Sequence, residues 1–327
     1  MIIFRIPPYT VHIKRNRGGI VRVDILKTIR FYAETAGTRI AFSSRAGSIS
    51  YAELWRRSGN LAGWINLEMG ENREPVIVFG HKDPMMIVCF LACVRSGRAY
   101  CPLDIPMSEK RIQEIMRQIR EPLFLTADPE RFPAINGAVS YEKIWEISDR
   151  DIIYLDICSC RKEDFFYVIF TSGSSGQPKS VPITADNLNH YLAWAVTLAG
   201  GIRTGAVFLN QAPYSYDLSV MDLYLSLATG GTVSAVDHNL LRDTGELIRY
   251  IRTQGIDYWT STPSFAELCL DEPAFAETNQ MNVSAFLFYG EPLSPETMGR
   301  LMERFPEAKI VNTYGLAETT VCDAGRD

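Results

Sequence analysis

The sequence lacks a hydrophobic run long enough to cross a membrane as a helix. Its longest apolar segment, residues 85–94, falls well short of the roughly 20 residues that a spanning helix needs, and it predicts a buried helix instead. The first residues, which include Pro7 and Pro8, contain no apolar stretch of signal-peptide length. We therefore expect a soluble, cytoplasmic protein.

Paired and metal-binding cysteine patterns are also missing. The seven cysteines are odd in number and scattered, and they match no zinc or Cys-x-x-Cys spacing. Cys158 and Cys160 alternate as strand residues on one face would, but the other ligands of a metal site do not accompany them. We expect mostly buried, reduced thiols.

There is no excess of positive charge, no internal repeat and no low-complexity linker. The formal net charge of −5 argues against nucleic acid or an anionic membrane as the main partner. The chain is 46% apolar and 22% charged, which is ordinary for a soluble globular protein. Its 327 residues allow a large core and more than one subdomain.

What the sequence does contain is a regular alternation of strand-like and helix-like segments. β-branched and aromatic runs end at glycine or proline and alternate with segments of helical periodicity. The predicted strands include residues 75–80, 98–104, 123–126, 167–170, 206–210, 232–236, 257–262, 285–290 and 309–312. This order predicts an α/β fold of mostly parallel sheets flanked by helices.

The most informative stretch is residues 167–179, Tyr-Val-Ile-Phe-Thr-Ser-Gly-Ser-Ser-Gly-Gln-Pro-Lys. Its apolar start predicts a buried strand, and the small residues that follow predict a loop with exposed backbone N–H groups and hydroxyls. Such donors beside Lys179 suit a polyphosphate. The alternative is a flexible Gly/Ser turn. The spacing of the Walker P-loop is absent.

Three more predicted strands end in chemically rich loops, at residues 211–217, 289–291 and 312–318. Ligands of open parallel sheets bind beyond the carboxyl ends of the strands. We therefore expect these three loops and residues 171–179 to converge on one site.

Residues 167–179, followed by Asn-Thr-Tyr-Gly-Leu-Ala-Glu at 312–318, resemble the adenylate-forming enzymes. That superfamily includes acyl-CoA synthetases and the adenylation domains of nonribosomal peptide synthetases. Residues 50–54 and 98–104 resemble its early core motifs. Three further segments are similar to the subfamily of D-alanine–D-alanyl carrier protein ligases: residues 211–221, 259–266 and 303–306.

The resemblance implies a division of the chain. Residues 1–23 would be an N-terminal extension, and residues 24–327 the large N-terminal core, with subdomains at about 24–180 and 181–327. The family's ribose-binding aspartate, hinge and small C-terminal lid domain with its catalytic lysine would lie beyond Asp327. A separate C-terminal fragment is therefore among the expected partners, and the activity of this chain alone stays open.

The resemblance also implies a reaction. An amino-acid carboxylate attacks the α-phosphorus of ATP in the presence of Mg2+, which gives an aminoacyl adenylate and pyrophosphate. The acyl group then passes to the phosphopantetheine thiol of a carrier protein. Positioning and charge neutralisation would dominate the catalysis.

Residue roles follow from the resemblance by position. Thr171, Lys179 and Glu318 would be catalytic, and Glu318 would be the magnesium ligand. Tyr314 would stack on adenine. The phosphates would be steered by Lys179 and by Thr171, Ser172, Gly173, Ser174, Ser175 and Gly176. Other nucleotide-binding residues would be Gly290, Glu291, Asn312, Thr313, Gly315, Leu316 and Ala317. The alternatives are a solvated surface role for Glu318 and an ordinary core role for Tyr314.

Asp217 matches the residue that pairs with the α-ammonium group of an amino-acid substrate, since a buried carboxylate needs such a partner. Its alternative role is to cap the helix predicted to begin at Leu218. Residues implied to line the side-chain pocket, each of which could equally be ordinary core, are Leu218, Met221, Thr260, Tyr289, Leu316 and Val321.

The sequence departs from the family pattern at Ser180, where glycine is usual, at Ala317, where a hydroxyl residue is usual, and at Tyr289, where the D-alanine ligases have a small residue. Three interpretations therefore remain open. They are an amino acid–carrier protein ligase, a CoA ligase for another small acid, and a non-catalytic binding remnant or scaffold subunit.

Overall fold

The computed structural model describes residues 23–120, 122–130, 135–150, 160–172, 177–276, 281–321 and 324–326. Most of the expected N-terminal extension, Gly173–Gly176, Cys158 and Cys322 lie outside these ranges. Among the cysteines described, Cys89, Cys93, Cys101 and Cys269 are buried free thiols, and Cys160 is partly buried. In the part of the chain that is described, no helix is long and apolar enough to cross a membrane.

The larger sheet has eight strands in the order β13-β12-β11-β10-β8-β9-β1-β2. Neighbours pair in parallel except at its two edges, where β1 pairs with β2 and β12 with β13 in antiparallel fashion. The bounds are β1 Ile40–Ser44, β2 Gly47–Ser50, β8 Val207–Asn210, β9 Thr232–Ala235, β10 Tyr258–Ser261, β11 Ala285–Phe288, β12 Lys309–Tyr314 and β13 Ala324–Arg326.

The smaller sheet has five strands in the order β5-β3-β4-β6-β7. Its strands also run parallel, except for the antiparallel hairpin of β6 and β7. The bounds are β3 Val76–Gly80, β4 Tyr100–Asp104, β5 Phe124–Thr126, β6 Phe165–Ser172 and β7 Pro178–Thr184. The predicted α/β class with mostly parallel sheets is confirmed.

Helices connect the strands, and most begin at a residue whose side chain caps the first turn. Ser50, for example, accepts a hydrogen bond from the backbone N–H of Glu53, as its position predicts. The α-helices are α1 Ile25–Thr35, α2 Tyr51–Met69, α3 Pro84–Arg95, α4 Glu109–Met116, α5 Tyr141–Asp149, α6 Ala185–Ala195, α7 Leu218–Ala228, α8 Thr244–Thr253, α9 Pro263–Leu270, α10 Pro273–Ala276 and α11 Pro295–Arg304.

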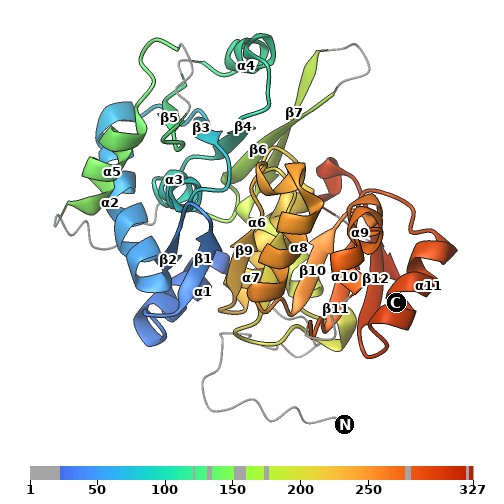
Figure 1. Cartoon of the computed structure of the whole chain (residues 1–327). Helices are drawn as coiled ribbons and strands as arrows, with labels where there is room; N and C mark the ends of the chain where they lie inside the picture. The colour runs from blue at the N-terminus through green and yellow to red at the C-terminus, as the bar shows by residue number, and fades with distance from the viewer. Residues whose placement is uncertain are drawn as a thin grey trace.

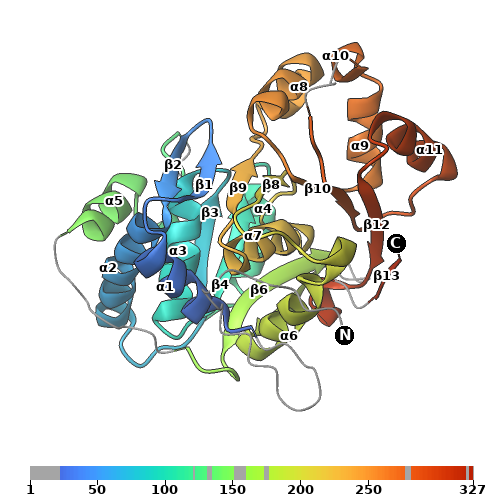
Figure 2. The ribbon, with the colours of Figure 1, turned by 90° about the horizontal axis from the view of Figure 1, so that it is seen from below.

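The two sheets pack in layers because successive residues of a strand face opposite sides. In β3, Val76 and Val78 face the central core with α1, α2, α3 and α7, whereas Ile77 and Phe79 face α4. In the larger sheet, Leu209 and Trp259 face a separate core with α8, α9 and α11. The views in Figure 1 and Figure 2 show α8–α11 covering the outer face of the larger sheet.

The buried helix predicted at residues 85–94 is α3, whose residues from Met85 to Arg95 are all buried. The expected boundary near residue 180 does not separate the two sheets. Strands β1 and β2 precede it but join the larger sheet through β9. Strand β7 crosses it and completes the smaller sheet. The division into two subdomains stays a prediction.

Candidate active site

The segment expected to hold phosphates lies at the tip of the β6–β7 hairpin. The predicted loop was too long, because Thr171 pairs with Lys179 and the pairing continues to Ser172 and Pro178. Helix α4 and the turn directly after it contact the hairpin. Arg111 Nη2 donates to the Thr171 carbonyl oxygen at 3.0 Å, and Gln118 Nε2 donates to the Pro178 carbonyl oxygen at 2.8 Å. The four residues Gly173, Ser174, Ser175 and Gly176 lie outside the described residues.

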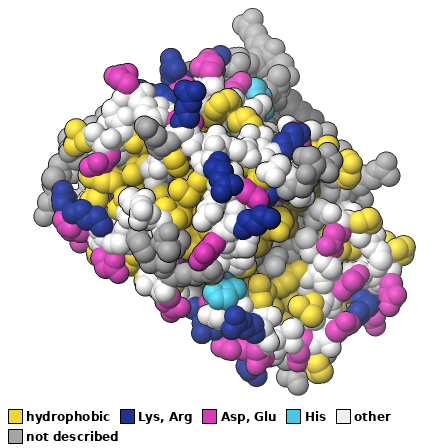
Figure 3. Space-filling model, turned by 90° about the horizontal axis from the view of Figure 1, so that it is seen from above, with side chains coloured by type: hydrophobic (Ala, Val, Ile, Leu, Met, Phe, Trp, Pro, Cys, Tyr) yellow, Lys and Arg dark blue, Asp and Glu magenta, His cyan; other side chains and the backbone are white. Residues whose placement is uncertain are grey.

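Lys179 forms an ion pair that crosses from one sheet to the other. Its Nζ lies 2.7 Å from Glu318 Oε1 in η3 (Ala317–Thr319), the short turn after β12. Both side chains are exposed, and the hydrogen bond from Lys179 lowers the pKa of Glu318. Figure 3 views the molecule from above and shows basic and acidic side chains side by side near the middle of that face.

Asp217 lies in the neighbouring loop and faces Tyr289, which follows β11. The Tyr289 hydroxyl donates to Asp217 Oδ2 at 2.7 Å and lies 3.2 Å from the carbonyl oxygen of Gly315. The Asp217 side chain makes no capping hydrogen bond to α7, so the capping alternative is not supported. Burial raises the pKa of Asp217, and the nearby negative charge of Glu318 raises it further.

Several expected pocket residues are buried beside this contact. Leu218, Met221, Tyr289 and Val321 belong to the central core. Thr260 is 1% exposed, and its hydroxyl has no hydrogen-bond partner among the described residues. By contrast, Leu316 is exposed, and Ala317 packs at the edge of the core.

The expected adenine-binding residues follow β11 and β12. Tyr314 is 72% exposed at the end of β12, so the core alternative for Tyr314 is wrong. The Thr313 hydroxyl donates to the Phe288 carbonyl oxygen at 2.7 Å. Glu291 accepts hydrogen bonds from the backbone N–H and hydroxyl of Ser264, which holds it against the start of α9.

Two further expected nucleotide-binding residues are Asn312 in β12 and Gly290 after β11. Asn312 is partly buried, and its Oδ1 lacks a partner within the described residues. Gly290 is exposed with a φ of 90°, a conformation that other residues rarely adopt.

Thr320 and Val321 also have positive φ, 61° and 72°. This conformation costs on the order of 1–3 kcal/mol at each position and occurs most often at functional sites.

A buried polar junction beneath the loop of residues 211–217 was not predicted. Lys82, which follows β3, donates through Nζ to Asn210 Oδ1 and to the Ala212 carbonyl oxygen, both at 2.6 Å. Asn210 Nδ2 in turn donates to Asp222 Oδ1 at 2.9 Å. Burial lowers the pKa of Lys82 to about 8 and raises that of Asp222 to about 7.

The same loop is held from a second side. Asp104 Oδ1 lies 2.7 Å from His81 Nδ1, and Asp104 Oδ2 accepts a hydrogen bond from the Tyr214 backbone N–H at 3.2 Å. The contacts of His81, Lys82 and Asp104 therefore link the smaller sheet to the loop that ends at Asp217. The sequence signal was a His-Lys-Asp run directly after a buried strand.

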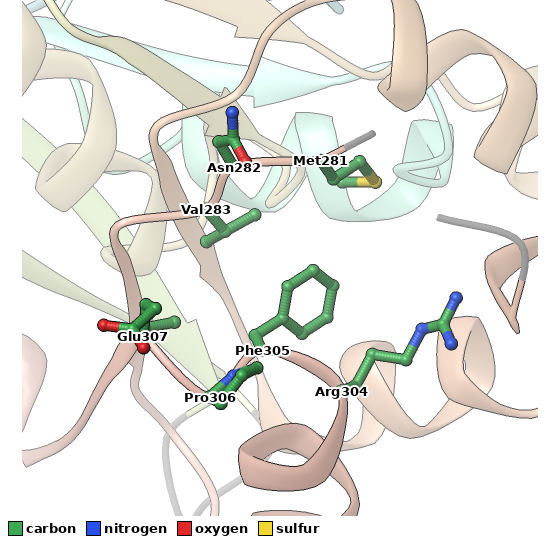
Figure 4. A pocket seen from close by; sticks show the side chains of 8 residues that line it. Met281, Asn282, Val283, Arg304, Phe305, Pro306 and Glu307 are labelled. Carbon is green, nitrogen blue, oxygen red and sulfur yellow. The ribbon is translucent and has the colours of Figure 1, made fainter. Parts of the chain in front are cut away.

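A surface hollow lies at the opposite end of the strands, where β11 and β12 of the larger sheet begin. Its walls are residues 281–283, which precede β11, and residues 304–308, which precede β12. Figure 4 shows Phe305 between Val283 and Arg304 in this hollow. Because ligands of parallel sheets bind at the carboxyl ends of the strands, the hollow does not belong to the candidate site.

Comparison with known proteins agrees with this geometry. Residues 30–326 match the family model described as AMP-binding enzyme. A D-alanine--D-alanyl carrier protein ligase of Bacillus cereus (strain B4264) is 40% identical over 310 residues, which cover 93% of this chain and 60% of that protein. The chain thus spans about three fifths of the length of the curated relatives it matches.

The fold also matches solved structures of nonribosomal peptide synthetases. FmoA3 superposes with a TM-score of 0.80 at 19% identity, over 94% of this chain and 33% of FmoA3. Holo-PA1221, which contains adenylation and PCP domains, superposes with a TM-score of 0.76 at 22% identity, over 93% of this chain and 52% of PA1221. These likenesses show the shared fold.

Proposed function

The chain belongs to the AMP-binding enzyme family, and from that premise we propose that it activates a small, D-alanine-like amino acid with ATP. The products would be an aminoacyl adenylate and pyrophosphate, and the acyl group would pass to a phosphopantetheinyl carrier protein. The observation that carries the proposal is that three of the expected segments meet. The Tyr289 hydroxyl contacts both Asp217 and the Gly315 carbonyl oxygen, and Glu318, in the same loop as Gly315, pairs with Lys179.

The Lys179–Glu318 pair gives the phosphate end of the site one charge of each sign. Lys179 would bind phosphate oxygens, and Glu318 would hold Mg2+, a hard cation that prefers carboxylate oxygen. The exposed Glu318 carboxylate, with its lowered pKa, fits a magnesium ligand. When bound, the metal would neutralise phosphate charge. Thr171, Ser172 and residues 173–176 would surround the same phosphates.

The other end of the site suits an amino acid. Asp217 would pair with the α-ammonium group, which orients the substrate carboxylate toward the α-phosphorus. A substrate carboxylate oxygen forms the new bond to that phosphorus, while the bond to the bridging α–β oxygen breaks and pyrophosphate leaves. Lys179 would stabilise the charge on the departing phosphates. Leu218, Met221, Thr260, Tyr289 and Val321 would limit the space for the side chain.

The nucleotide base would bind along the loops after β11 and β12. The exposed ring of Tyr314 would stack on adenine, with Gly290, Glu291 and Asn312 around it and Thr313, Gly315 and Leu316 beside it. Ala317 supplies no hydroxyl to the α-phosphate. Because one lost donor of this kind costs about 2–4 kcal/mol, we expect slow adenylation by this chain.

A second candidate is a non-catalytic ATP- and amino-acid-binding subunit. It is favoured by the missing hydroxyl at Ala317. A CoA ligase for a small acid is less well supported, because Asp217 would bury a carboxylate without an ammonium partner.

The test is amino-acid-dependent exchange of labelled pyrophosphate into ATP, with D-alanine, L-alanine, glycine and serine. We expect weak ATP binding and little exchange by the chain alone, with exchange restored by the C-terminal part of a related ligase. Exchange with neither preparation, together with no ATP binding by calorimetry, would refute the activation function.

The role of Asp217 has its own test. Asp217→Ala should abolish the selectivity for amino acids over acids without an amine, because the anchor for the ammonium group is lost. Amino-acid binding should also weaken as the pH falls through the pKa of Asp217, which burial raises, since the protonated acid no longer attracts a cation. Unchanged selectivity in the variant would rule out the anchor role.

A further inference from the structure

We propose that Tyr289 is a specificity-determining residue whose hydroxyl occupies the place of the substrate's ammonium group when no amino acid is bound. The inference rests on the proposed function, because it assigns an internal competitor to the amino-acid end of the same site. It concerns how strongly this site distinguishes an amino acid from an acid without an amine.

The geometry consists of two acceptors that converge on one donor. The Tyr289 hydroxyl lies 2.7 Å from Asp217 Oδ2 and 3.2 Å from the Gly315 carbonyl oxygen. These acceptors come from different loops, one before α7 and the other after β12. The Tyr289 side chain is 6% exposed, so its hydroxyl reaches both acceptors from inside the pocket wall.

A phenol satisfies this pair of acceptors poorly. It carries one proton and no charge, whereas an ammonium group carries three donors and a positive charge. An entering amino acid can therefore displace the phenol from Asp217, but it must break an existing hydrogen bond to do so. The Tyr289 hydroxyl thus lowers the affinity of the site for amino acids. It lowers the affinity for acids without an amine much less, because they do not compete for Asp217.

The test compares the full chain with Tyr289→Phe, which keeps the ring and removes the hydroxyl. Ligand-observed NMR would measure binding of D-alanine, glycine and propionate in the presence of Mg2+ and a non-hydrolysable ATP analogue. Since hydrogen bonds to charged groups contribute about 1.5–3 kcal/mol, or tenfold and more in affinity, we expect the preference for D-alanine over propionate to rise about tenfold.

Tyr250→Phe is the matched control, because it removes a hydroxyl that donates to the Ala235 carbonyl oxygen at 3.2 Å, outside the candidate site. It should leave the preference unchanged. A cycle of Asp217→Asn, Tyr289→Phe and the double variant, followed by urea unfolding, tests the contact without any ligand. We expect non-additive changes in the unfolding midpoint.

The outcomes separate the two proposals. An unchanged preference in Tyr289→Phe, or additive midpoints in the cycle, would overturn the role of Tyr289 and leave amino-acid activation standing. If no variant bound the ATP analogue or any acid, the proposed function would fail, and the competition at Asp217 would fail with it. A raised preference together with non-additivity would support both.

Discussion

The two linkages between the sheets differ in burial and in the number of partners. Lys82 is 3% exposed and sits among Asn210, the Ala212 carbonyl and the ring of Tyr214. The Lys179 and Glu318 side chains are 61% and 46% exposed. An exposed pair is screened by water and contributes little to stability, whereas breaking a buried network leaves an uncompensated group.

The difference assigns the two linkages separate roles. The buried junction fixes the position of the loop that ends at Asp217, because its contacts reach that loop from the smaller sheet. The exposed pair can exchange its partners for a ligand at little cost. Under the proposed function, Lys179 and Glu318 would release each other when phosphate and Mg2+ bind. The predictions below test this separation.

The largest expected effect is on stability at the buried junction. Lys82→Met should lower the free energy of unfolding by about 3–5 kcal/mol, because Asn210 and the Ala212 carbonyl lose a buried donor and Asp222 loses the nearby positive charge. Urea denaturation measures it. Lys179→Met is the matched control and should leave the midpoint unchanged. Equal effects of the two substitutions would remove the distinction between the linkages.

The next effect is on nucleotide binding at the exposed pair. Glu318→Gln should weaken Mg2+-dependent ATP binding about tenfold or more, since a neutral amide is a poorer ligand for a hard cation. The unfolding midpoint should not change. Calorimetry with and without Mg2+ measures the binding. A fall in stability without a change in ATP binding would contradict the role of the exposed pair in ligand binding.

A smaller effect is expected in the pH dependence of stability. The Asp222 carboxyl titrates near 3.8 when unfolded and at about 7 when folded. Between these values the folded protein holds a proton that the unfolded chain releases, so stability falls as the pH rises, by at most about 1.4 kcal/mol per pH unit. Burial raises the pKa of Asp83 to about 6, which acts in the same direction.

Asp222→Asn should make this fall shallower between pH 4 and 7. The remaining slope should come from Asp83 and Asp217, whose pKa values are also raised by burial. Urea denaturation at several pH values measures the slope. An unchanged slope would mean that Asp222 is not the titrating group, and the buried junction would then be charged throughout this range.

The smallest effect is that of salt. Raising the ionic strength should weaken ATP binding at the exposed pair, because Lys179 is open to screening. It should hardly affect the Lys82 contacts, which water does not reach. ATP titrations and urea denaturation at low and high salt measure the two responses. A larger salt effect on unfolding than on ATP binding would contradict the separation.

The fold was largely predictable because strand and helix periodicities are local. Strand β8, for instance, appears in the sequence as a short apolar run between turn residues, and α3 as a continuous apolar segment. Sheet membership was not predictable. Strand β1 pairs with β9, nearly 200 residues later in the chain, and β2 joins the sheet through β1. Nothing local encodes the pairing of β1 with β9.

The candidate site was predictable to the extent that its residues lie in motifs. The segments that contain Asp217, Lys179 and Glu318 were singled out from the sequence, and the roles of these residues stay predictions. The loop at residues 171–179 was predicted too long, because main-chain pairing extends through Ser172. The Tyr289–Asp217 contact and the Lys82 junction were missed. Each depends on which side chains from distant segments meet in the fold, and no spacing along the chain reports that.

The most direct test of the central claim is a calorimetric titration of MgATP into the chain, Lys179→Met and Lys82→Met. We predict measurable binding by the chain and a loss of about tenfold in Lys179→Met, which removes the positive charge at the phosphates. At temperatures where Lys82→Met is still folded, that variant should keep most of its affinity for ATP. Absence of ATP binding by the unaltered chain, or equal binding by Lys179→Met, would contradict the account.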